Sequence, residues 1–331
     1  MRVGTRETHD RATPRAQTPR RAIGDVLLER SVWLAACAVL ALLIAVAAFL
    51  VWRSIPAIRQ DSANFLTTRT WLPDDTPPVF GVAAIAFGTA LSATVALVLA
   101  VPVAIGSAIF VTQYVPPRVG VWLGYCLDLL AAVPSVVYGL WGMLWLVPAM
   151  TPIQHGLATT LGFLPFFADP QGLTRQASRS IFVVGIVLAA MIIPIIAAVT
   201  REVIRQVDPG LREAAWALGA TRWEMVRIAI LPASKLGIAG AVLLGLGRAL
   251  GETIAVALVL GTSFAVDFHL LVFGKNTIAA NIATQFAEAG SLGRSALIAS
   301  GLVLFAMTML TTLLARAIIY RSGSRERSAF A

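Results

Sequence analysis

The stretch that decides the fold is SVWLAACAVLALLIAVAAFLVW, residues 31–52, in which 22 consecutive residues carry no charge. A bilayer core about 30 Å thick is crossed by about 20 helical residues, so the stretch predicts a transmembrane helix. A cleaved signal peptide is the alternative, but its apolar core is only about 7–15 residues long. Residues 31–52 therefore predict a permanent membrane span.

Further apolar runs follow along the chain, several of them interrupted by proline, which predicts bends. The chain is thus expected to be an all-α polytopic membrane protein with six transmembrane helices in one domain, residues 31–320. A polar tail, residues 1–30, has the composition of a disordered segment, and a short tail, residues 321–331, closes the chain. The five further predicted spans are Val79–Val111, Val119–Val147, Ile181–Thr200, Leu236–Val266 and Leu297–Tyr320.

The composition excludes a water-soluble globule. Hydrophobic residues make up 58% of the chain and charged residues 13%, with a mean hydropathy of +0.80, so too little polar surface exists to cover a soluble fold. The net charge of +9 could suggest nucleic acid as a partner. The basic residues flank apolar runs, however, and do not form a patch with interleaved aromatics, so we expect a lipid environment and no nucleic acid.

The distribution of basic residues predicts the orientation. With six spans, the two tails share one side with the 112–118 turn and the 201–235 loop. With Arg316, near the end of the last predicted span, counted together with the tail that follows it, that side carries 18 of the 26 Lys and Arg residues, the other side carries 7, and Arg248 lies deep within a span. Because cytoplasmic segments are enriched in Lys and Arg, both termini are expected in the cytoplasm.

Signatures of metal or nucleotide binding are missing from the sequence. The two cysteines form no CxxC pair and the three histidines are scattered, so we expect no metal site. The one Gly-Lys pair, Gly274-Lys275, lacks the remainder of a GxxxxGK[ST] phosphate loop. We therefore expect no cofactor and no catalytic site on this chain, and an ATP-driven transporter would need its nucleotide site on another polypeptide.

The 201–235 loop is expected to form two short helices. Asp208-Pro209 resembles an N-cap followed by proline at the first helical position, and Gly219 suits a left-handed C-terminal cap. Residues 221–224, Thr-Arg-Trp-Glu, form a capping box that opens the second helix, and Leu231-Pro232 is expected to close it. The apolar side chains of Trp216, Leu218 and Trp223 would then lie on anionic lipid or against a partner.

A family resemblance favours a protein partner over anionic lipid as the surface that this loop contacts. Glu213-Ala214-Ala215, Gly219 and Leu231-Pro232 are similar to the EAA loop of ABC-importer permeases, with Ala229 in place of that pattern's isoleucine. The resemblance implies the type I ABC importer permease fold. It also implies that this loop is the coupling helix seated in a groove of a cytoplasmic ATPase.

The most expensive stretch in the membrane is GRALGET, residues 247–253. Arg248 lies 13 residues beyond Lys235, about 20 Å into a helix, where each charge costs about 2.5–3.5 kcal/mol. Arg248 and Glu252 are four residues apart, which would place them on one helix face. Two interpretations remain open: a buried ion pair that fixes packing, and a solute path.

The same stretch, continued by Ile-Ala-Val, resembles the fifth span of phosphate-uptake permeases of the PstC type. The resemblance covers about residues 60–320 and includes residues 132–139, Ala-Val-Pro-Ser-Val-Val-Tyr-Gly. The Ile-Ala-Val continuation and residues 64–71 favour the PstC type over its sister, the PstA type.

This resemblance implies a permease of the bacterial cytoplasmic membrane that translocates phosphate. Its partners would be a PstA-type permease, two PstB-type ATPases that bind ATP and Mg, and an external PstS-type binding protein. Arg248 would bind two phosphate oxygens. Glu252 would accept the proton of phosphate and disfavour sulfate, and Ser135 and Thr253 would contribute hydroxyl groups.

Three other functions are compatible with parts of the sequence. Sulfate, molybdate or phosphonate could replace phosphate as the solute of the same kind of importer. A channel or ion-coupled carrier acting alone is disfavoured by the EAA-like loop. A membrane-embedded enzyme would need several polar residues at one depth, whereas Asp128 lies near the cytoplasmic edge, away from Arg248 and Glu252.

Overall fold

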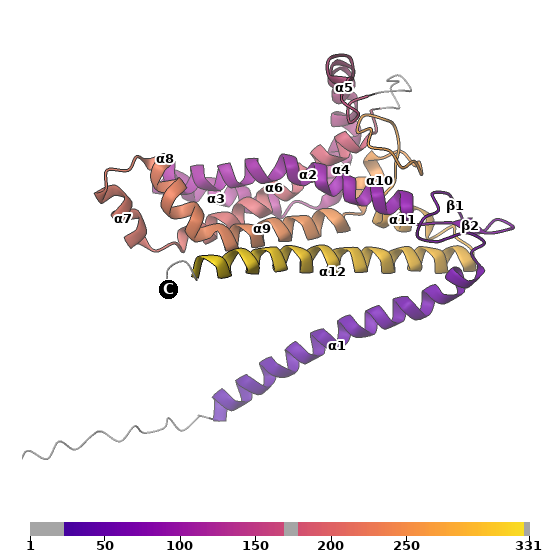
Figure 1. Ribbon diagram of the computed structural model, residues 1–331, viewed down its shortest axis with the longest axis horizontal. Coiled ribbons are helices and arrows are strands. Elements are labelled where there is room, and N and C mark those ends of the chain that lie inside the picture. Colours follow the sequence, from indigo (N-terminus) through magenta and orange to yellow (C-terminus); the bar gives the residue numbers. More distant parts are fainter. Residues whose placement is uncertain (1–22, 169–177, 328–331) are drawn as a thin grey trace, which may run out of the picture. The chain divides into compact units, whose positions relative to one another are not determined.

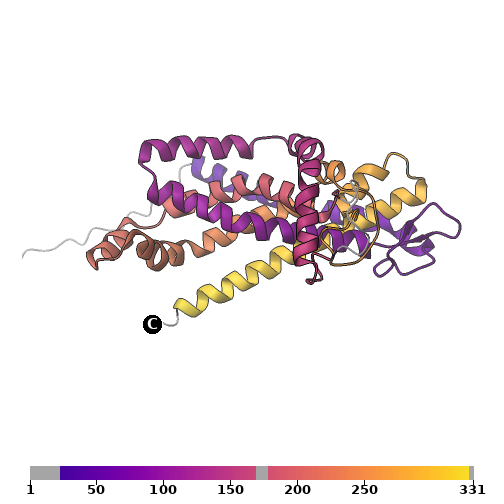
Figure 2. The ribbon, with the colours of Figure 1, turned by 90° about the horizontal axis from the view of Figure 1, so that it is seen from above.

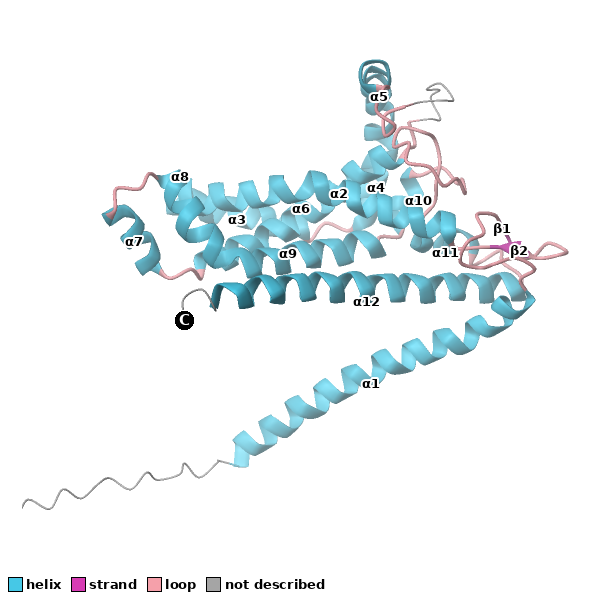
Figure 3. Ribbon diagram, viewed as in Figure 1, coloured by secondary structure: helices cyan, strands magenta, loops and turns pink. Residues whose placement is uncertain are grey.

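The computed structural model describes residues 23–168 and 178–327, which are helical apart from one short hairpin and the loops (Figure 3). Two compact units are distinguished, Met1–Ala48 and Phe49–Ala331. The described part of the first unit is the beginning of helix α1 (Ile23–Gln60). From Leu27 onward the large apolar side chains of this part are exposed, as expected of a single helix surrounded by lipid.

Within the described parts of the chain, six helices are long and apolar enough to cross a membrane, which confirms the predicted number. Their boundaries differ from the prediction by up to eight residues in four spans and by more in the third and fifth. The six are Leu27–Gln60, Ala83–Tyr114, Ser135–Leu161, Ile181–Arg205, Arg222–Gly251 and Ser291–Ala317.

The predicted third span, Val119–Val147, is divided at its middle. Helix α3 (Pro117–Ala131) ends just before Pro134, and α4 (Ser135–Trp141) starts directly after it. Proline has no amide hydrogen and disfavours helical backbone at the preceding residue, so the helix breaks there. The helix then continues through a π turn, Gly142–Leu146, into α5 (Val147–Leu161), while α3 lies along α6 (Figures 1 and 2).

The predicted fifth span, Leu236–Val266, is also wrong in its bounds. Helix α9 (Leu231–Gly251) ends fifteen residues earlier than predicted, and a six-residue helix, α10 (Ile254–Val259), follows it. Residues 260–277 form a loop. In the other direction the helix extends without interruption back to Arg222.

The core of the second unit lies where α2 (Ala83–Ile109), α6 (Ile181–Arg205) and α9 pack together. Small residues allow the close approach: a Cβ on Gly185 of α6 would lie 2.3 Å from Val95 of α2. Large aliphatic side chains of α6 fill the remaining space. The buried alanines of α2 in this core are Ala93, Ala96, Ala100 and Ala104.

The two ends of this bundle are different. At one end lie α7 (Pro209–Ala217), α8 (Arg222–Met225) and the C-terminal end of α12 (Ser291–Arg327), as both views show (Figures 1 and 2). At the other end lie α11 (Ile278–Gln285) and the antiparallel hairpin of β1 (Trp71–Leu72) and β2 (Val79–Phe80). In the hairpin Trp71 pairs with Phe80, and Leu72 pairs with Val79. The 201–235 loop and the chain's last helix therefore share one end, as the predicted topology requires.

Candidate translocation site and coupling loop

Arg248 lies three residues before the last residue of α9, with an exposed side chain. Gly247 and Gly251, on either side of it in the sequence, border open space. No hydrogen bond or ion pair between described residues involves Arg248. Its charge does act on the hydroxyl of Tyr138 in α4. Arg248 is thus a permanent cation inside a span, and no anion from residues 23–168 or 178–327 is paired with it.

The helix breaks immediately after this cation. Glu252 has an extended backbone (φ −68°, ψ 126°), and its buried side chain accepts the Ala255 amide at 3.2 Å. Thr253 Oγ1 donates to the Gly251 carbonyl at 3.1 Å. Arg248 and Glu252 are therefore not an i, i+4 pair on a continuous helix, as the sequence had suggested. The carboxylate supports the start of α10 instead of forming an ion pair with the arginine.

Helices α4 and α10 run side by side in the same direction. A Cβ on Gly139 would lie 2.8 Å from Ala255 Cα, and a Cβ on Gly142 would lie 3.0 Å from Val259 Cγ2. This register places Ser135, one turn before Gly139, at the level of the break after α9. Two helices thus begin next to each other, one after Pro134 and one after Glu252.

The structure therefore gathers three of the four predicted solute contacts, Arg248, Glu252 and Thr253, at the end of α9, with Ser135 opposite them by register. Tyr138 belongs to the same region but was not predicted as a site residue. The sequence could have indicated Tyr138, because it lies one helical turn after Ser135. The arrangement offers an exposed guanidinium, a carboxylate and hydroxyl groups, which is a chemistry suited to a protonated oxyanion.

The predicted caps of the 201–235 loop, the candidate coupling loop, are confirmed. Asp208 Oδ1 accepts the Gly210 amide at 2.9 Å at the start of α7, and Gly219 has a left-handed backbone with φ +80°. In the capping box the Glu224 amide donates to Thr221 Oγ1 at 3.3 Å, and the Thr221 amide donates to Glu224 Oε2 at 2.8 Å.

The predicted end of the second loop helix at Leu231-Pro232 is wrong. The helix passes from α8 through a π turn, Val226–Ile230, directly into α9. Pro232 lies in the first turn of α9, where the missing amide hydrogen is tolerated because the wider π turn before it already alters the hydrogen-bond ladder. The second loop helix and the fifth span are therefore one helix.

The coupling loop has one packed face and one exposed face. Ala215, Met225 and Ile230 are buried against the ends of α2 and α6, and Arg212 donates to the Ile204 carbonyl at 2.8 Å. Glu213 and Ala214 are exposed. The exposed large apolar side chains of the loop include the three predicted ones, Trp216 (53%), Leu218 (86%) and Trp223 (56%). The loop is thus fixed to the bundle and presents an apolar surface away from it.

An ion pair between α3 and α6 was not predicted. Arg201 Nη2 donates to both carboxylate oxygens of Asp128, at 3.0 and 3.1 Å. The arginine side chain is 10% exposed and the aspartate side chain 49%. Gly124 provides the space, since a Cβ there would lie 2.5 Å from Arg201 Nη1.

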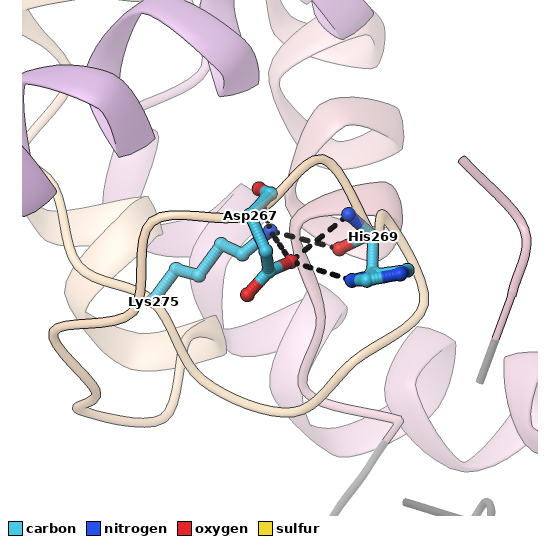
Figure 4. Close-up of polar contacts among 3 residues, drawn as sticks. All are labelled: Asp267, His269 and Lys275. Carbon is cyan, nitrogen blue, oxygen red and sulfur yellow. Dashed lines mark hydrogen bonds and ion pairs between the residues drawn. The ribbon is translucent and has the colours of Figure 1, made fainter. Parts of the chain in front are cut away.

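A second unpredicted cluster fixes the 260–277 loop. The ammonium of Lys275 is fully buried and donates to the carbonyls of Asp267 and His269, each at 2.8 Å (Figure 4). It also pairs with Asp267 Oδ1 at 2.9 Å. Burial raises the pKa of Asp267, but the hydrogen bond and charge of Lys275, with the His269 amide, outweigh burial and hold this pKa below its usual value. All three ammonium hydrogens are in use, so the cluster is structural.

Among residues 23–168 and 178–327, no group of three or more His, Cys, Asp or Glu side chains is placed to hold a metal ion.

Comparison with known proteins shows which transport proteins this chain is similar to. Residues 100–324 match the family described as "Binding-protein-dependent transport system inner membrane component". The permease protein PstC 2 of the phosphate transport system of Mycobacterium tuberculosis is 41% identical over 297 residues, which are 89% of this chain and 91% of the relative. PstC of Mycobacterium leprae is 44% identical over 281 residues (84% and 87%). PstC of Haemophilus influenzae is 40% identical over 301 residues (89% and 93%).

A solved structure shares the fold. It is described as a bacterial ABC transporter involved in the import of the acidic polysaccharide alginate. The TM-score is 0.53 at 18% identity, covering 88% of this chain and 96% of that chain. This likeness supports the type I ABC importer permease architecture.

Proposed function

The chain belongs to the PstC family of binding-protein-dependent inner membrane transport components, and from this premise we propose that it is a permease subunit of an ATP-driven importer of inorganic phosphate. It is a multi-pass membrane protein and a transport component. We also propose its substrate, its site residues, its partner subunits and the location of both termini in the cytoplasm.

Arg248 is the observation that carries the assignment. Exposing a guanidinium to lipid within a span has a large free-energy cost. The exposed side of Arg248 must therefore face water, a partner subunit or an anion. Its forked donors match two phosphate oxygens at once. The open space beside Gly247 and Gly251 leaves room for a solute at this point.

Glu252 supplies a basis for selecting phosphate. Inorganic phosphate keeps at least one proton near neutral pH, whereas sulfate has none to donate. A carboxylate at the break can accept that proton's hydrogen bond, but it repels a fully ionised oxyanion. Oε1 already accepts the Ala255 amide, which holds the carboxylate next to the space that Arg248 borders. Ser135 and Thr253 would add hydroxyl contacts.

The coupling loop supports an ATPase partner. Its apolar outer face, with Trp216, Leu218 and Trp223 exposed at the loop end of the bundle, is suited to a protein groove. In the complete importer we propose a PstA-type permease, two PstB-type ATPases that bind ATP and Mg, and a PstS-type binding protein on the opposite side. ATP binding on this side, together with the basic residues of the tails and loops, would place both termini in the cytoplasm.

Uptake of labelled phosphate by cells whose only phosphate importer contains this chain tests the proposal. We expect Arg248→Gln and Glu252→Gln each to lower uptake about 10–100-fold, the loss that follows removal of a charge-assisted hydrogen bond. Arg316→Gln, an exposed arginine of α12, is the matched control and should transport normally. Wild-type uptake by both site variants, with normal amounts of protein in the membrane, would remove Arg248 and Glu252 from the site.

Competition separates phosphate from other oxyanions. In proteoliposomes that contain the whole complex and its binding protein, excess unlabelled phosphate should abolish ATP-dependent uptake of labelled phosphate, and sulfate should not. Equal inhibition by sulfate or molybdate would assign the importer to a different oxyanion. Uptake without ATP would instead indicate a carrier that acts alone.

A further inference from the structure

The residue that fixes α10 comes from a distant part of the chain. Arg179, which lies just before α6, donates from Nε to the Val259 carbonyl at 3.1 Å. From Nη2 it donates to the carbonyls of Leu258 and Leu260, at 2.9 and 3.2 Å. One guanidinium thus binds three consecutive carbonyls at the C-terminal end of α10.

These carbonyls need a donor from outside their own helix. The last carbonyls of any helix have no partner within it, and α10 is only six residues long. Val259 and Leu260 are buried, so water does not take the role easily. A helix this short is not stable alone, and the position of α10 therefore depends on what holds its two ends.

Helix α10 is held by two kinds of contact: packing along its side, and hydrogen bonds at its two ends. Gly139 and Gly142 of α4 set how closely α10 approaches laterally. At the N-terminal end of α10, Glu252 accepts a hydrogen bond from the helix, and at the C-terminal end Arg179 donates hydrogen bonds to it. A lateral contact between the glycines of α4 and the apolar residues of α10 permits sliding along the axis, whereas hydrogen bonds at the end carbonyls oppose it. Arg179 is therefore the contact that fixes α10 along its own direction.

Arg179 is itself anchored to the rigid part of the bundle. It precedes α6, the helix at the centre of the core. Its carbonyl accepts the Gly274 amide at 3.2 Å, its neighbour Ser180 pairs with Phe273, and the Phe182 amide donates to the Leu270 carbonyl at 3.1 Å. The start of α6 thus holds both α10 and the loop that follows it.

We propose that Arg179 is a positioning residue for the solute site: it fixes α10 so that the break at Glu252 and Thr253 keeps its place relative to Arg248. The effect on transport rests on the proposed function above, whereas the effect on the break itself does not. Arg179 touches neither the solute nor Arg248. It acts through α10, whose N-terminal end carries the carboxylate.

Two measurements test this proposal in the complete complex. The first follows the break directly, with Thr253→Cys in a chain whose Cys37 and Cys126 are replaced by serine. The rate of modification by an anionic methanethiosulfonate reagent is compared with and without Arg179→Gln. We expect the Arg179 variant to change this rate several-fold. The control is Arg294→Gln, an exposed arginine that lies over Phe286 and should leave the rate unchanged.

The second measurement uses transport and chemical rescue. We expect Arg179→Ala to lower phosphate uptake about tenfold or more and to weaken the preference for phosphate over sulfate, because Glu252 is then displaced. Added guanidinium ion should restore part of both properties, and Arg179→Lys should retain part of them, since an ammonium also donates to carbonyls. A residue needed only for stability would lower the amount of complex without changing selectivity.

The outcomes separate the two proposals. If the wild-type complex does not transport phosphate but Arg179→Gln alters modification at residue 253, the substrate assignment fails and the positioning role stands. If Arg179→Gln and Arg179→Lys both assemble, modify residue 253 at the wild-type rate and keep wild-type selectivity, the positioning role is refuted. Loss of assembly in Arg179→Ala that guanidinium ion does not reverse, together with unchanged modification in Arg179→Lys, also counts against it.

Discussion

Replacement of Lys275 by methionine isolates the buried ammonium described above. Methionine has a similar volume, so the change leaves little cavity and removes mainly the charge and its three hydrogen bonds. Removing one partner of a buried ion pair costs about 3–5 kcal/mol, because the other charge is left unpaired. The Asp267 side chain is 27% exposed and keeps some hydration, so we expect the lower value, about 3 kcal/mol. The unfolding equilibrium would change more than 100-fold.

The pH dependence of this loss has a defined sign. In the wild type Lys275 holds the pKa of Asp267 below its usual value of 3.8. The pair therefore stabilises the fold fully above that value, and its contribution is lost as the pH falls through the lowered pKa. In Lys275→Met burial is the largest remaining influence and raises the pKa of Asp267. On acidification the Asp267 carboxylate is therefore protonated at a higher pH in Lys275→Met than in the wild type. The difference in unfolding free energy between the two proteins should accordingly become smaller between pH 7 and pH 4.

Unfolding of the detergent-solubilised chain by sodium dodecyl sulfate, followed by tryptophan fluorescence at pH 7 and pH 4, measures both effects. The double variant Lys275→Met with Asp267→Asn should be more stable than Lys275→Met alone, because no unpaired charge remains. A loss below about 1 kcal/mol at pH 7, or a difference that widens on acidification, would refute the account of Lys275 as a buried charge held by Asp267.

Two further substitutions probe the contacts that shape the bundle. Gly139→Val would place its Cβ 2.8 Å from Ala255 Cα and push α10 away from α4, so we expect uptake to fall at least tenfold with normal insertion; normal uptake would show that this contact is not needed. Asp128→Ala should lower the free energy of unfolding by about 3 kcal/mol, because Arg201, 10% exposed, loses its partner. Asp128→Asn, which keeps an acceptor, should lose less in the same unfolding measurement, and equal losses would contradict the ion-pair explanation.

Much of the architecture could be predicted because it depends on local sequence. The six spans are set by runs of apolar residues longer than a bilayer requires. The caps at Asp208 and Thr221, and the left-handed Gly219, follow from residue types at fixed short spacings. These features need no knowledge of neighbouring helices, and the structure confirms them.

The errors occurred where the local pattern and the tertiary contacts differ. The apolar run through Leu236–Val266 continues past Gly251, so hydropathy alone indicates one helix. The helix ends there because Glu252 turns to accept the Ala255 amide, which a periodicity argument does not detect. At Leu231-Pro232 the opposite error arose, since proline suggested a stop and a π turn accommodated it.

The supporting residues of the site could not be predicted because their partners are far away in the sequence. Arg179 binds carbonyls about 80 residues later, and Arg201 pairs with a residue 73 positions earlier. Both had been counted only as charges that report topology. Backbone carbonyls have no sequence signature, so a cation that binds them cannot be distinguished from an ordinary loop arginine before the fold is known.

The unbroken helix from Arg222 to Gly251 has a mechanical consequence. Its 30 residues measure about 45 Å along the helix, pass through the π turn at Val226–Ile230, and carry the exposed Trp223 near one end and Arg248 near the other. A displacement of the first end is transmitted to Arg248 along continuous helical backbone, whereas the break at Glu252 separates this helix from α10. In the importer proposed above, ATP turnover that tilts this helix would change the separation between the Arg248 guanidinium and the Glu252 carboxylate, and so convert a site that holds an anion into one that releases it.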